Sequence, residues 1–282
     1  MRQLTQKLKS GNMTVREILI PTVDNNKILI KNHYSLISSG TEGSTVSTAR
    51  KSVIGKIKER PQQFKKVLEV LKTQGIANTY RAVNKKLDSY SPLGYSCAGE
   101  VITVGDNVKE FSIGDKVACA GVGYANHAEV VAVPVNLTVK LPENANMKYA
   151  AYNTLGAIAM QGVRQADMRV GETCVVIGLG LIGQLTCLIL RASGVRVIGV
   201  DVSEYAVDMA KKSAGIALLR NTQGIEGIID EFTVGIGADA VIITAATDSL
   251  DPVNFAGAVA RKKGKVIIVG AVPTGFNREP HY

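Results

Sequence analysis

The sequence predicts an α/β protein whose C-terminal half is built on a parallel, doubly wound sheet and whose N-terminal half is a β-rich domain. Three observations predict this class. Apolar runs and helical patterns alternate from residue 173 onward. A glycine-rich turn at Gly178 joins the first of these apolar runs to a helix. Short alternating runs bounded by glycine occupy residues 99–141.

The glycine-rich turn follows Cys174–Ile177 and consists of Gly178, Leu179, Gly180, Leu181, Ile182 and Gly183. Gly178 suits the sharp turn, Gly180 leaves no Cβ in the way of a pyrophosphate, and Gly183 lets the helix lie close on the strand. The helix N-terminus offers unpaired N–H groups to phosphate. We expect all six residues to bind a dinucleotide; the alternative is a glycine turn with no nucleotide.

The residue that ends the next apolar run indicates which dinucleotide is bound. The run Val195–Val200 ends at Asp201, roughly 20 residues beyond the glycines, where a carboxylate accepts hydrogen bonds from ribose hydroxyl groups. Its charge repels a 2′-phosphate, and the next residues, 202–204, contain no Arg or Lys to bind one. We therefore predict that Asp201 and Val202 contact NAD rather than NADP.

The alternating pattern predicts five parallel strands, near Val175, Val197, Ala217, Val241 and Val266. The helices between them are expected to begin near Leu181, Ser203, Gly224 and Ser249. Ligands bind at the carboxyl ends of such strands. We expect further cofactor contacts at the ends of the last two strands: Thr244, Ala245, Val269, Gly270 and Ala271. A full dinucleotide domain usually has six strands, so we expect the chain to continue in a longer protein.

The N-terminal half shows shorter elements. Residues 18–37 predict two strands, and residues 38–42 predict a polar loop. Four runs with glycine turns between residues 99 and 141 predict a small, strongly bent β-domain. The pattern changes near Pro142, and residues 147–165 predict a helix.

A basic insert lies between these parts. Residues 50–90 contain eleven Lys and Arg against three acidic residues, whereas the whole chain carries +9. Helices are predicted over residues 61–75, where Gly75 ends the pattern, and over residues 80–87. A solvated helix face explains this charge most simply. An anionic substrate is the next explanation, and nucleic acid is disfavoured because aromatic interleaving and a binding motif are missing.

Composition excludes several classes. Apolar residues make up 46% of the chain, but no apolar run reaches the roughly 18 residues that a membrane helix needs. The N-terminus lacks the apolar core of a signal peptide, so we expect a cytoplasmic protein. The cysteines stand far apart without a CxxC motif, which favours reduced core thiols over disulfides or a zinc ribbon: Cys97, Cys119, Cys174 and Cys187.

One stretch carries a resemblance to a known family. Its residues are Pro92-Leu-Gly94-Tyr-Ser-Cys-Ala-Gly99-Glu-Val101, followed by Gly105, Phe111, Gly114-Asp115 and Val117. They are similar to the signature of medium-chain dehydrogenases/reductases, the zinc-type alcohol dehydrogenase superfamily. The glycine turn, Asp201 and Gly237–Asp239 match that family's second domain. The resemblance covers nearly the whole chain and implies a GroES-like β-domain over residues 1–148 and a Rossmann NAD-binding domain over residues 149–282.

Residues 50–90 carry a second, narrower resemblance. They look like a zinc-lacking subgroup sometimes called bi-domain oxidoreductases. In that subgroup a second half, similar to glucose-fructose oxidoreductases, follows the dehydrogenase half, and members tend to be associated with bacterial surface polysaccharide metabolism. The resemblance implies a covalently following second domain and a sugar or nucleotide-sugar substrate.

The sequence departs from the zinc-dependent members at their metal ligands. The corresponding positions hold Ser39, Tyr95-Ser96 and Asn153, and zinc prefers thiolate, imidazole or carboxylate. We therefore predict no catalytic zinc, and we find no four-cysteine lobe for a structural one. The three histidines are expected to be isolated surface or structural residues: His33, His127 and His281.

Without a metal, three side chains are candidates for catalysis. The resemblance places Thr41 where the family relays the substrate proton, although its hydroxyl could simply bond its own backbone. Tyr95 could donate a hydrogen bond to a carbonyl oxygen or serve as acid and base, or it could only pack on the cofactor. Glu42 is the nearby carboxylate.

These features together predict a zinc-independent, NAD(H)-dependent oxidoreductase that transfers hydride to or from an alcohol or carbonyl of a small molecule, such as a sugar derivative. An NADPH-dependent quinone or enoyl-type reductase is the rival enzyme, which Asp201 disfavours. A non-catalytic NAD-binding module is the rival from another class. We expect no membrane partner and consider a homodimer, with substrate and reaction direction left open.

Overall fold

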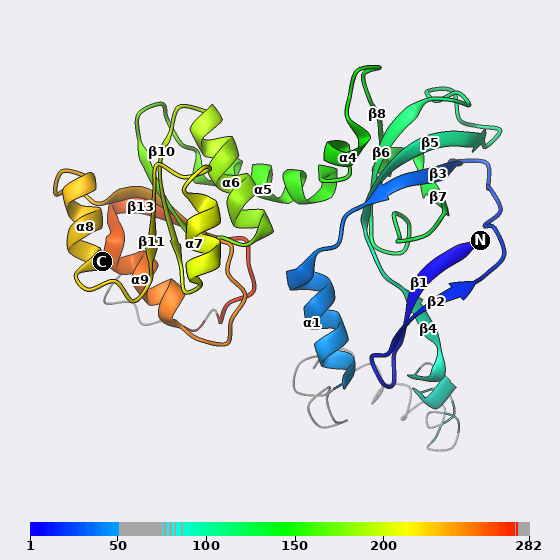
Figure 1. Ribbon diagram of the computed structural model, residues 1–282, viewed down its shortest axis with the longest axis horizontal. Coiled ribbons are helices and arrows are strands. Elements are labelled where there is room, and N and C mark those ends of the chain that lie inside the picture. Colours follow the sequence, from blue (N-terminus) through cyan, green and yellow to red (C-terminus); the bar gives the residue numbers. More distant parts are fainter. Residues whose placement is uncertain are drawn as a thin grey trace. The chain divides into compact units, whose positions relative to one another are not determined.

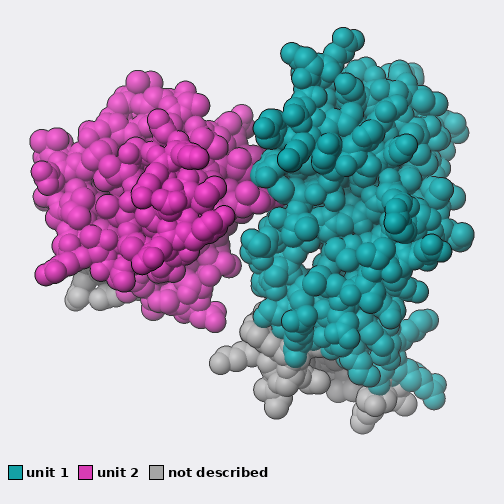
Figure 2. Space-filling view, viewed as in Figure 1, with its two compact units in different colours: residues 1–154 teal, residues 155–282 magenta. Residues whose placement is uncertain are grey.

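The computed structural model describes residues 1–50, 75, 78, 81, 83–85, 87–273 and 275. These residues form two compact units, residues 1–154 and residues 155–282 (Figure 2). The first unit contains a three-stranded and a five-stranded sheet, and the second contains a five-stranded parallel sheet (Figure 1).

The first unit is mostly antiparallel. Its strands are β1 (Arg2–Lys7), β2 (Met13–Glu17), β3 (Lys27–Ser35), β4 (Tyr90–Pro92), β5 (Ser96–Val104), β6 (Lys116–Ala120), β7 (Val130–Pro134) and β8 (Thr138–Lys140). They pair in the orders β2-β1-β4 and β7-β3-β5-β6-β8. The core of the larger sheet includes Ile28, Ile30, Val101 and Val117, all fully buried. This is the GroES-like β-domain expected from the resemblance, and its last four strands fall where the glycine-bounded runs predict them.

The helical elements of this unit, or adjoining it, include α1 (Ser39–Arg50), the 3-10 turn η1 (Val135–Leu137), α4 (Met147–Ala150) and the start of α5 (Asn153–Ala166). The helix predicted over residues 147–165 is thus two helices, interrupted at Ala151 and Tyr152. At the other end of α4, the side chain of Asn146 caps the helix start by accepting from the backbone N–H of Lys148.

Two expectations for the N-terminal half are wrong. Residues 18–26 form no strand; β2 ends at Glu17 and β3 begins at Lys27. Pro21 lacks a backbone donor for a sheet, and Leu19 and Ile20 are 92% and 56% exposed, so their apolar character marks no core face. The polar loop expected at residues 38–42 is instead the start of α1. The Glu42 carboxylate accepts from the backbone N–H of Ser38 at 3.0 Å, which satisfies a donor that the helix start leaves open.

The helix predicted over residues 61–75 lies outside the described residues, apart from Gly75. In the second predicted helix, the described residues Arg81, 83–85 and Leu87 are helical. Within the part of the chain that the structure describes, no helix is long and apolar enough to cross a membrane.

The second unit is the Rossmann domain predicted from the alternating pattern. Its strands are β9 (Thr173–Ile177), β10 (Arg196–Asp201), β11 (Ile216–Leu219), β12 (Ala238–Ile243) and β13 (Ala260–Ile268). They are ordered β11-β10-β9-β12-β13. From the central β9 the chain first adds β10 and β11 on one side, and it then crosses back to add β12 and β13 on the other side. The order reverses between β9 and β12, which is where open α/β sheets bind ligands.

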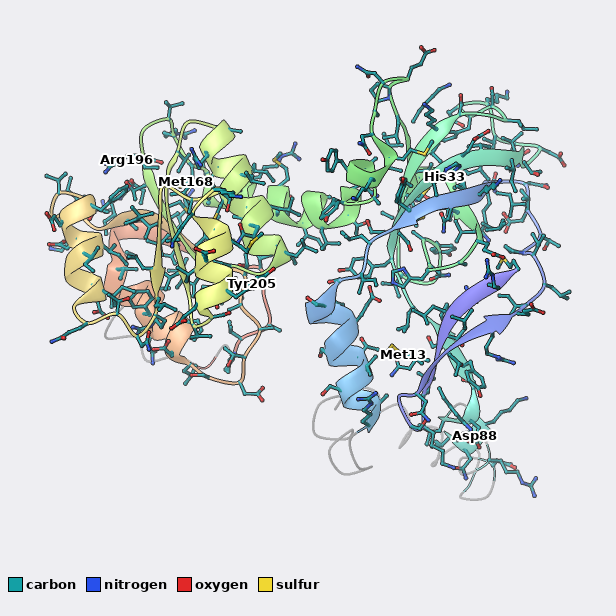
Figure 3. All side chains as sticks on the ribbon, in the orientation of Figure 1. Met13, His33, Asp88, Met168, Arg196 and Tyr205 are labelled. Atoms are coloured by element: carbon teal, nitrogen blue, oxygen red, sulfur yellow. The ribbon has the colours of Figure 1, made fainter. Side chains whose placement is uncertain are left out.

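Helices cover both faces of this sheet (Figure 1). They are α5, α6 (Leu181–Ala192), α7 (Glu204–Ala210), α8 (Ile225–Phe232) and α9 (Asp251–Val259). Residues of α5, α6 and α7 form one core cluster with Cys174 and Val176, and Met168 packs against it (Figure 3). Residues of α8 and α9 form the other cluster with Val175 and Ile177. Because alternate residues of β9 serve opposite faces, the whole strand is apolar, as the sequence pattern predicts.

Candidate functional site

The glycine turn is held by close backbone packing at the carboxyl end of β9. Gly178 has φ +96°, and a Cβ there would lie 2.5 Å from the backbone nitrogen of Ala245. A Cβ on Gly183 would collide with the carbonyl oxygen of Gly178 and lie 2.9 Å from Thr244 Oγ1. Both positions therefore require glycine for the fold itself: the first for its backbone conformation, the second for the approach of α6 to the turn.

Gly180 differs from its two neighbours. It begins α6 as the residue before the first helical turn, and a Cβ added to it would meet no atom within 4 Å. No side chain caps this end of the twelve-residue α6. The open space in front of Gly180 and the uncapped N–H groups are the arrangement that a pyrophosphate needs.

Asp201 lies at the end of β10 and faces the turn. Its Oδ2 accepts from the backbone N–H of Leu179 at 2.6 Å, and its Oδ1 accepts from the backbone N–H of Ser203 at 2.8 Å. Leu179 is buried, and its backbone N–H and carbonyl oxygen are bonded to Asp201 and Gln184. An ionised carboxylate has about four acceptor sites. Asp201 therefore retains acceptor capacity for hydroxyl groups while it is tied to the turn.

The segments after β12 and β13 lie beside the turn. The backbone nitrogens of Thr244 and Ala245 donate to the carbonyl oxygen of Ile177, at 2.8 and 3.1 Å, and Thr244 Oγ1 donates to Gly178 O at 2.5 Å. Gly270 has no room for a Cβ against the carbonyl oxygen of Ala245. The predicted cofactor residues of three strand ends are therefore brought together: the glycine turn, Thr244–Ala245 and the segment 269–271.

The basic residue nearest to Asp201 along the sheet is already paired. The Arg220 backbone N–H donates to the Asp201 carbonyl oxygen at 2.8 Å. The Arg220 guanidinium binds both carboxylate oxygens of Asp251, at 3.0 and 2.8 Å, and stacks 4.0 Å from the Phe255 ring centroid. Val202 and Tyr205, the latter on α7 (Figure 3), are 82% and 77% exposed. A 2′-phosphate would therefore meet an acid and an arginine that is engaged elsewhere.

The three positions that the sequence analysis predicts to correspond to zinc ligands hold a hydroxyl, a phenol and an amide. Ser39 is exposed at the start of α1, whereas Tyr95 is 8% exposed before β5. Asn153 Nδ2 donates to the carbonyl oxygens of Cys119, Ala150 and Cys97, at 3.1, 3.2 and 3.3 Å. A hydroxyl, a phenol and an amide committed to backbone do not make a zinc site. Within the described ranges, no cluster of three or more His, Cys, Asp or Glu could hold a metal.

Ser96 and Asn153 form a structural network instead. Ser96 is fully buried, and its Oγ donates to the Ala151 carbonyl oxygen at 2.7 Å and accepts from the backbone N–H of Thr154 at 3.2 Å. Thr154 Oγ1 donates to the carbonyl oxygen of Tyr95 at 3.1 Å. These bonds join β5 and β6 to the start of α5 and hold the backbone of Tyr95 in place.

The candidate Glu42 has a partner that the sequence analysis missed. His127 Nε2 lies 2.9 Å from Glu42 Oε2, and His127 Nδ1 lies 2.8 Å from Ser35 Oγ. The side chains of His127 and Glu42 are only 8% and 11% exposed. The expectation that His127 is isolated is therefore wrong, because the fold places this loop residue against the first turn of α1, 85 positions away. No spacing in the sequence signals this contact.

His127 also contacts the segment that carries Tyr95. The His127 backbone N–H donates to the Leu93 carbonyl oxygen at 2.8 Å. Gly94 has φ +96°, and a Cβ on it would lie 2.9 Å from His127 Nδ1. Thr41, the third candidate, is exposed one residue before Glu42. The structure thus links Glu42 and the Tyr95 segment through His127.

His33 is a surface residue on β3, 3.9 Å from Glu100 (Figure 3).

Comparison with known proteins agrees with this architecture. Residues 70–143 match the model of the alcohol dehydrogenase GroES-like domain, and residues 182–280 match the model named zinc-binding dehydrogenase. The second stretch contains none of the three zinc-ligand positions. The D-guloside 3-dehydrogenase of Shigella flexneri is 31% identical over 198 residues, which cover 67% of this chain and 55% of that protein.

Two further comparisons point the same way. D-xylulose reductase A of Aspergillus oryzae is 30% identical over 183 residues, which cover 53% of this chain and 51% of that protein. A crystal structure of an Escherichia coli oxidoreductase/dehydrogenase of unknown specificity, involved in membrane biogenesis, superposes with a TM-score of 0.75 at 23% identity, over 99% of this chain and 81% of that one. The chain spans about half the length of the curated relatives it matches.

The chain belongs to the medium-chain dehydrogenase/reductase superfamily, the group of oxidoreductases related to zinc-type alcohol dehydrogenases. Dehydrogenases of this family bind nicotinamide cofactors.

Proposed function

We propose that this chain is an NAD(H)-dependent oxidoreductase that acts on an alcohol or carbonyl group of a sugar or sugar derivative and uses no catalytic zinc. The observation that carries the proposal is the placement of Asp201 on the glycine turn, with Gly180 open in front of α6. This arrangement supports binding of a dinucleotide with a free ribose 2′-hydroxyl.

The residues that would hold the cofactor follow from that geometry. Gly180, Leu181 and Ile182 would present backbone N–H groups to the pyrophosphate, and Asp201 would accept from the adenosine ribose. Thr244–Ala245 and the segment 269–271 would lie beside the nicotinamide half. When bound, the cofactor supplies the hydride acceptor or donor. The protein must then orient the substrate and provide groups that donate or accept the substrate proton.

We assign the transfer of the substrate proton to three side chains of the first unit. Thr41 is exposed at the start of α1, and its hydroxyl would approach a substrate oxygen. Tyr95 would donate a hydrogen bond to that oxygen. Glu42, the next residue of α1, would place its carboxylate close to the Thr41 hydroxyl. The donors at Ser39, Tyr95 and Asn153 do not fit zinc, so no step needs a metal.

The sugar class of substrate rests on the relatives. D-guloside 3-dehydrogenase and D-xylulose reductase carry sugar substrates in their names. Both match this chain at about 30% identity, which supports the chemical class and not one compound.

The test is calorimetric titration of the 282-residue chain with NAD, NADH and NADPH, together with metal analysis of the same sample. A panel of polyols, aldoses, ketoses and glycosides is then screened by nicotinamide absorbance. We expect NAD(H) to bind at least tenfold more tightly than NADPH, turnover of one or more sugars, and no stoichiometric zinc. Preferred binding of NADPH would instead support the quinone or enoyl-type reductase. Binding of NAD with no turnover of the panel would support a non-catalytic module.

A further inference from the structure

The side-chain amide of Gln184 connects three segments of the second unit. Gln184 lies on α6, one helical turn after Gly180, to whose carbonyl oxygen its backbone N–H donates at 2.9 Å. Its Nε2 donates to the carbonyl oxygens of Leu179, at 3.1 Å, and of Ala206, at 3.3 Å. Its Oε1 accepts from the hydroxyl of Ser213. One amide therefore joins the glycine turn, α7 and the segment that follows α7.

The partners of this amide allow only one orientation of it. Backbone carbonyl oxygens can only accept, so the nitrogen of the Gln184 amide faces Leu179 and Ala206. The amide oxygen then faces Ser213, whose hydroxyl can donate. Ser213 is buried, so water does not compete for this bond. Both N–H groups and the oxygen of the amide are used, and the side chain is held in one position.

The bond from Gln184 to Leu179 also sets the direction of the Gly180 N–H. The carbonyl of Leu179 and the N–H of Gly180 belong to one planar trans peptide, in which the two groups point in opposite directions. Within the described residues, the Gly180 N–H has no hydrogen-bond acceptor. A Cβ added to Gly180 would meet no atom within 4 Å. Gln184 therefore holds the carbonyl on the protein side and turns an unused donor toward open space.

The same side chain is connected to the acid at the end of β10. The Leu179 N–H donates to Asp201 Oδ2 at 2.6 Å, and the Ser203 N–H donates to Asp201 Oδ1 at 2.8 Å. Leu179 is thus held by Asp201 at its N–H and by Gln184 at its carbonyl oxygen. The bond from Gln184 to Ala206 holds the start of α7, directly after Ser203.

We infer that Gln184, supported by Ser213, is a positioning residue of the dinucleotide site. It orients the Gly180 N–H toward the pyrophosphate and keeps Asp201 aligned with the glycine turn. The inference rests on the proposed function, because it takes the glycine turn as the place where the cofactor binds. The Gln184 amide is fully used within the protein, so this residue acts through Leu179 and Gly180 and not on the cofactor itself.

The first test measures binding without turnover. ADP-ribose contains the pyrophosphate and the adenosine ribose but no nicotinamide, so calorimetry with it reports this half of the site alone. Gln184→Met keeps the length of the side chain and removes the amide. We expect it to weaken ADP-ribose binding by about tenfold, and we expect Ser213→Ala to weaken it by about threefold.

Thr233→Val is the matched control for a general loss of stability. Thr233 is buried in the same unit, and its hydroxyl oxygen accepts from the Gly237 N–H at 3.1 Å, with no bond to the glycine turn. Both Gln184→Met and Thr233→Val should lower the urea midpoint of unfolding, but only Gln184→Met should weaken ADP-ribose binding. An equal loss of affinity in both variants would overturn the positioning role.

A double-mutant cycle asks whether Gln184 acts through Gly180. Gly180→Ala places a methyl group where the pyrophosphate would lie, so the contact that Gln184 prepares is already lost. Adding Gln184→Met to Gly180→Ala should then weaken ADP-ribose binding by less than about threefold. A further tenfold loss, equal to the effect in the wild-type background, would show that Gln184 does not act through the Gly180 N–H.

The outcomes separate this inference from the proposed function. Equal ADP-ribose affinity of Gln184→Met and wild type would overturn the role of Gln184 and leave the proposed function standing. A wild-type chain that binds ADP-ribose with the expected effect of Gln184→Met, but turns over no sugar, would contradict the proposed function and support the role of Gln184. A wild-type chain that binds no dinucleotide would overturn both.

Discussion

The Asp201 carboxylate accepts a 2.6 Å hydrogen bond from the backbone N–H of Leu179, so the end of β10 is tied to the glycine turn after β9. This bond fixes the acid at the position that we propose for ribose binding. It also means that the residue proposed for cofactor choice contributes to the shape of the turn. The two roles can be separated by substitution.

Asp201→Asn keeps an acceptor oxygen for Leu179 and removes the charge. We expect NAD affinity to fall by about tenfold, which is about 1.4 kcal/mol, while NADPH affinity rises or stays level because the repulsion of a 2′-phosphate is gone. Calorimetry with both cofactors measures the change. Asp208→Asn, an exposed acid of α7, is the control. A variant with unchanged NAD to NADPH preference would show that Asp201 does not select the cofactor.

Two glycines of the turn should respond differently to the same change. Gly183→Ala places a Cβ against the Gly178 carbonyl oxygen, so we expect a loss of about 2–4 kcal/mol in the free energy of unfolding. Gly180→Ala meets no atom within 4 Å and should cost less than about 1 kcal/mol, yet weaken NAD binding at least tenfold. Urea unfolding and calorimetry separate the two effects. Equal stability of both variants would contradict the close approach of α6 to the turn.

We expect Asn153 to stabilise the fold through hydrogen bonds and not to bind a metal. Its amide nitrogen donates to backbone carbonyl oxygens of Cys97, Cys119 and Ala150. We expect Asn153→Ala to lower the free energy of unfolding by about 1–3 kcal/mol, because it leaves buried acceptors without a donor. Addition of zinc should restore nothing. If Asn153→Ala is as stable as wild type in urea, these contacts are not structural.

Asp115 provides a pH-dependent contribution to stability. The Lys140 ammonium, 2.6 Å away, and then the backbone N–H of Ser112 lower the pKa of Asp115 below its usual value. A lowered folded-state pKa stabilises the protein above the unfolded pKa, about pH 4, and this stability is lost as pH falls through the folded pKa. Asp115→Asn should therefore be less stable than wild type at neutral pH and equal to it in strong acid. Urea midpoints measure this, with exposed Asp106→Asn as control. A difference that persists in strong acid would refute the assignment.

The cysteines should be unreactive in the folded chain. All four are buried, and burial raises the pKa of Cys187 to about 12. The neighbouring Cys119 thiol and burial raise the pKa of Cys97, and burial raises that of Cys174. Because the thiolate is the reactive form, we expect no alkylation by iodoacetamide near pH 8 and alkylation of four thiols in urea. Mass spectrometry counts the labels. Rapid labelling of the folded chain would show that a thiol opens to solvent.

Local signals predicted the second unit well. Each strand of its sheet contains an apolar run, and strands and helices alternate along the chain, so the sequence pattern alone located β9 to β13 and the helices between them. The glycine turn was predictable because its requirements are local: Gly178 needs a positive φ, and Gly183 needs to lack a Cβ.

The first unit was less predictable. The start of α1 is Ser-Gly-Thr-Glu, whose residues favour turns in isolation. Its helical form depends on Glu42 bonding back to Ser38 and on His127 holding the same carboxylate. The apolar residues Leu19 and Ile20 suggested a strand, but they face solvent, and apolar character alone does not distinguish the two cases.

The sequence by itself determined the fold class and placed the glycine turn and Asp201 at neighbouring strand ends, because each depends on residue identity at short spacing. Only the tertiary structure decided that Ser35, His127 and Glu42 meet, that Asn153 bonds to backbone, and that Arg220 is held by Asp251. These contacts join residues far apart in the chain through strand register and helix packing, and no local pattern in a single sequence encodes such pairings.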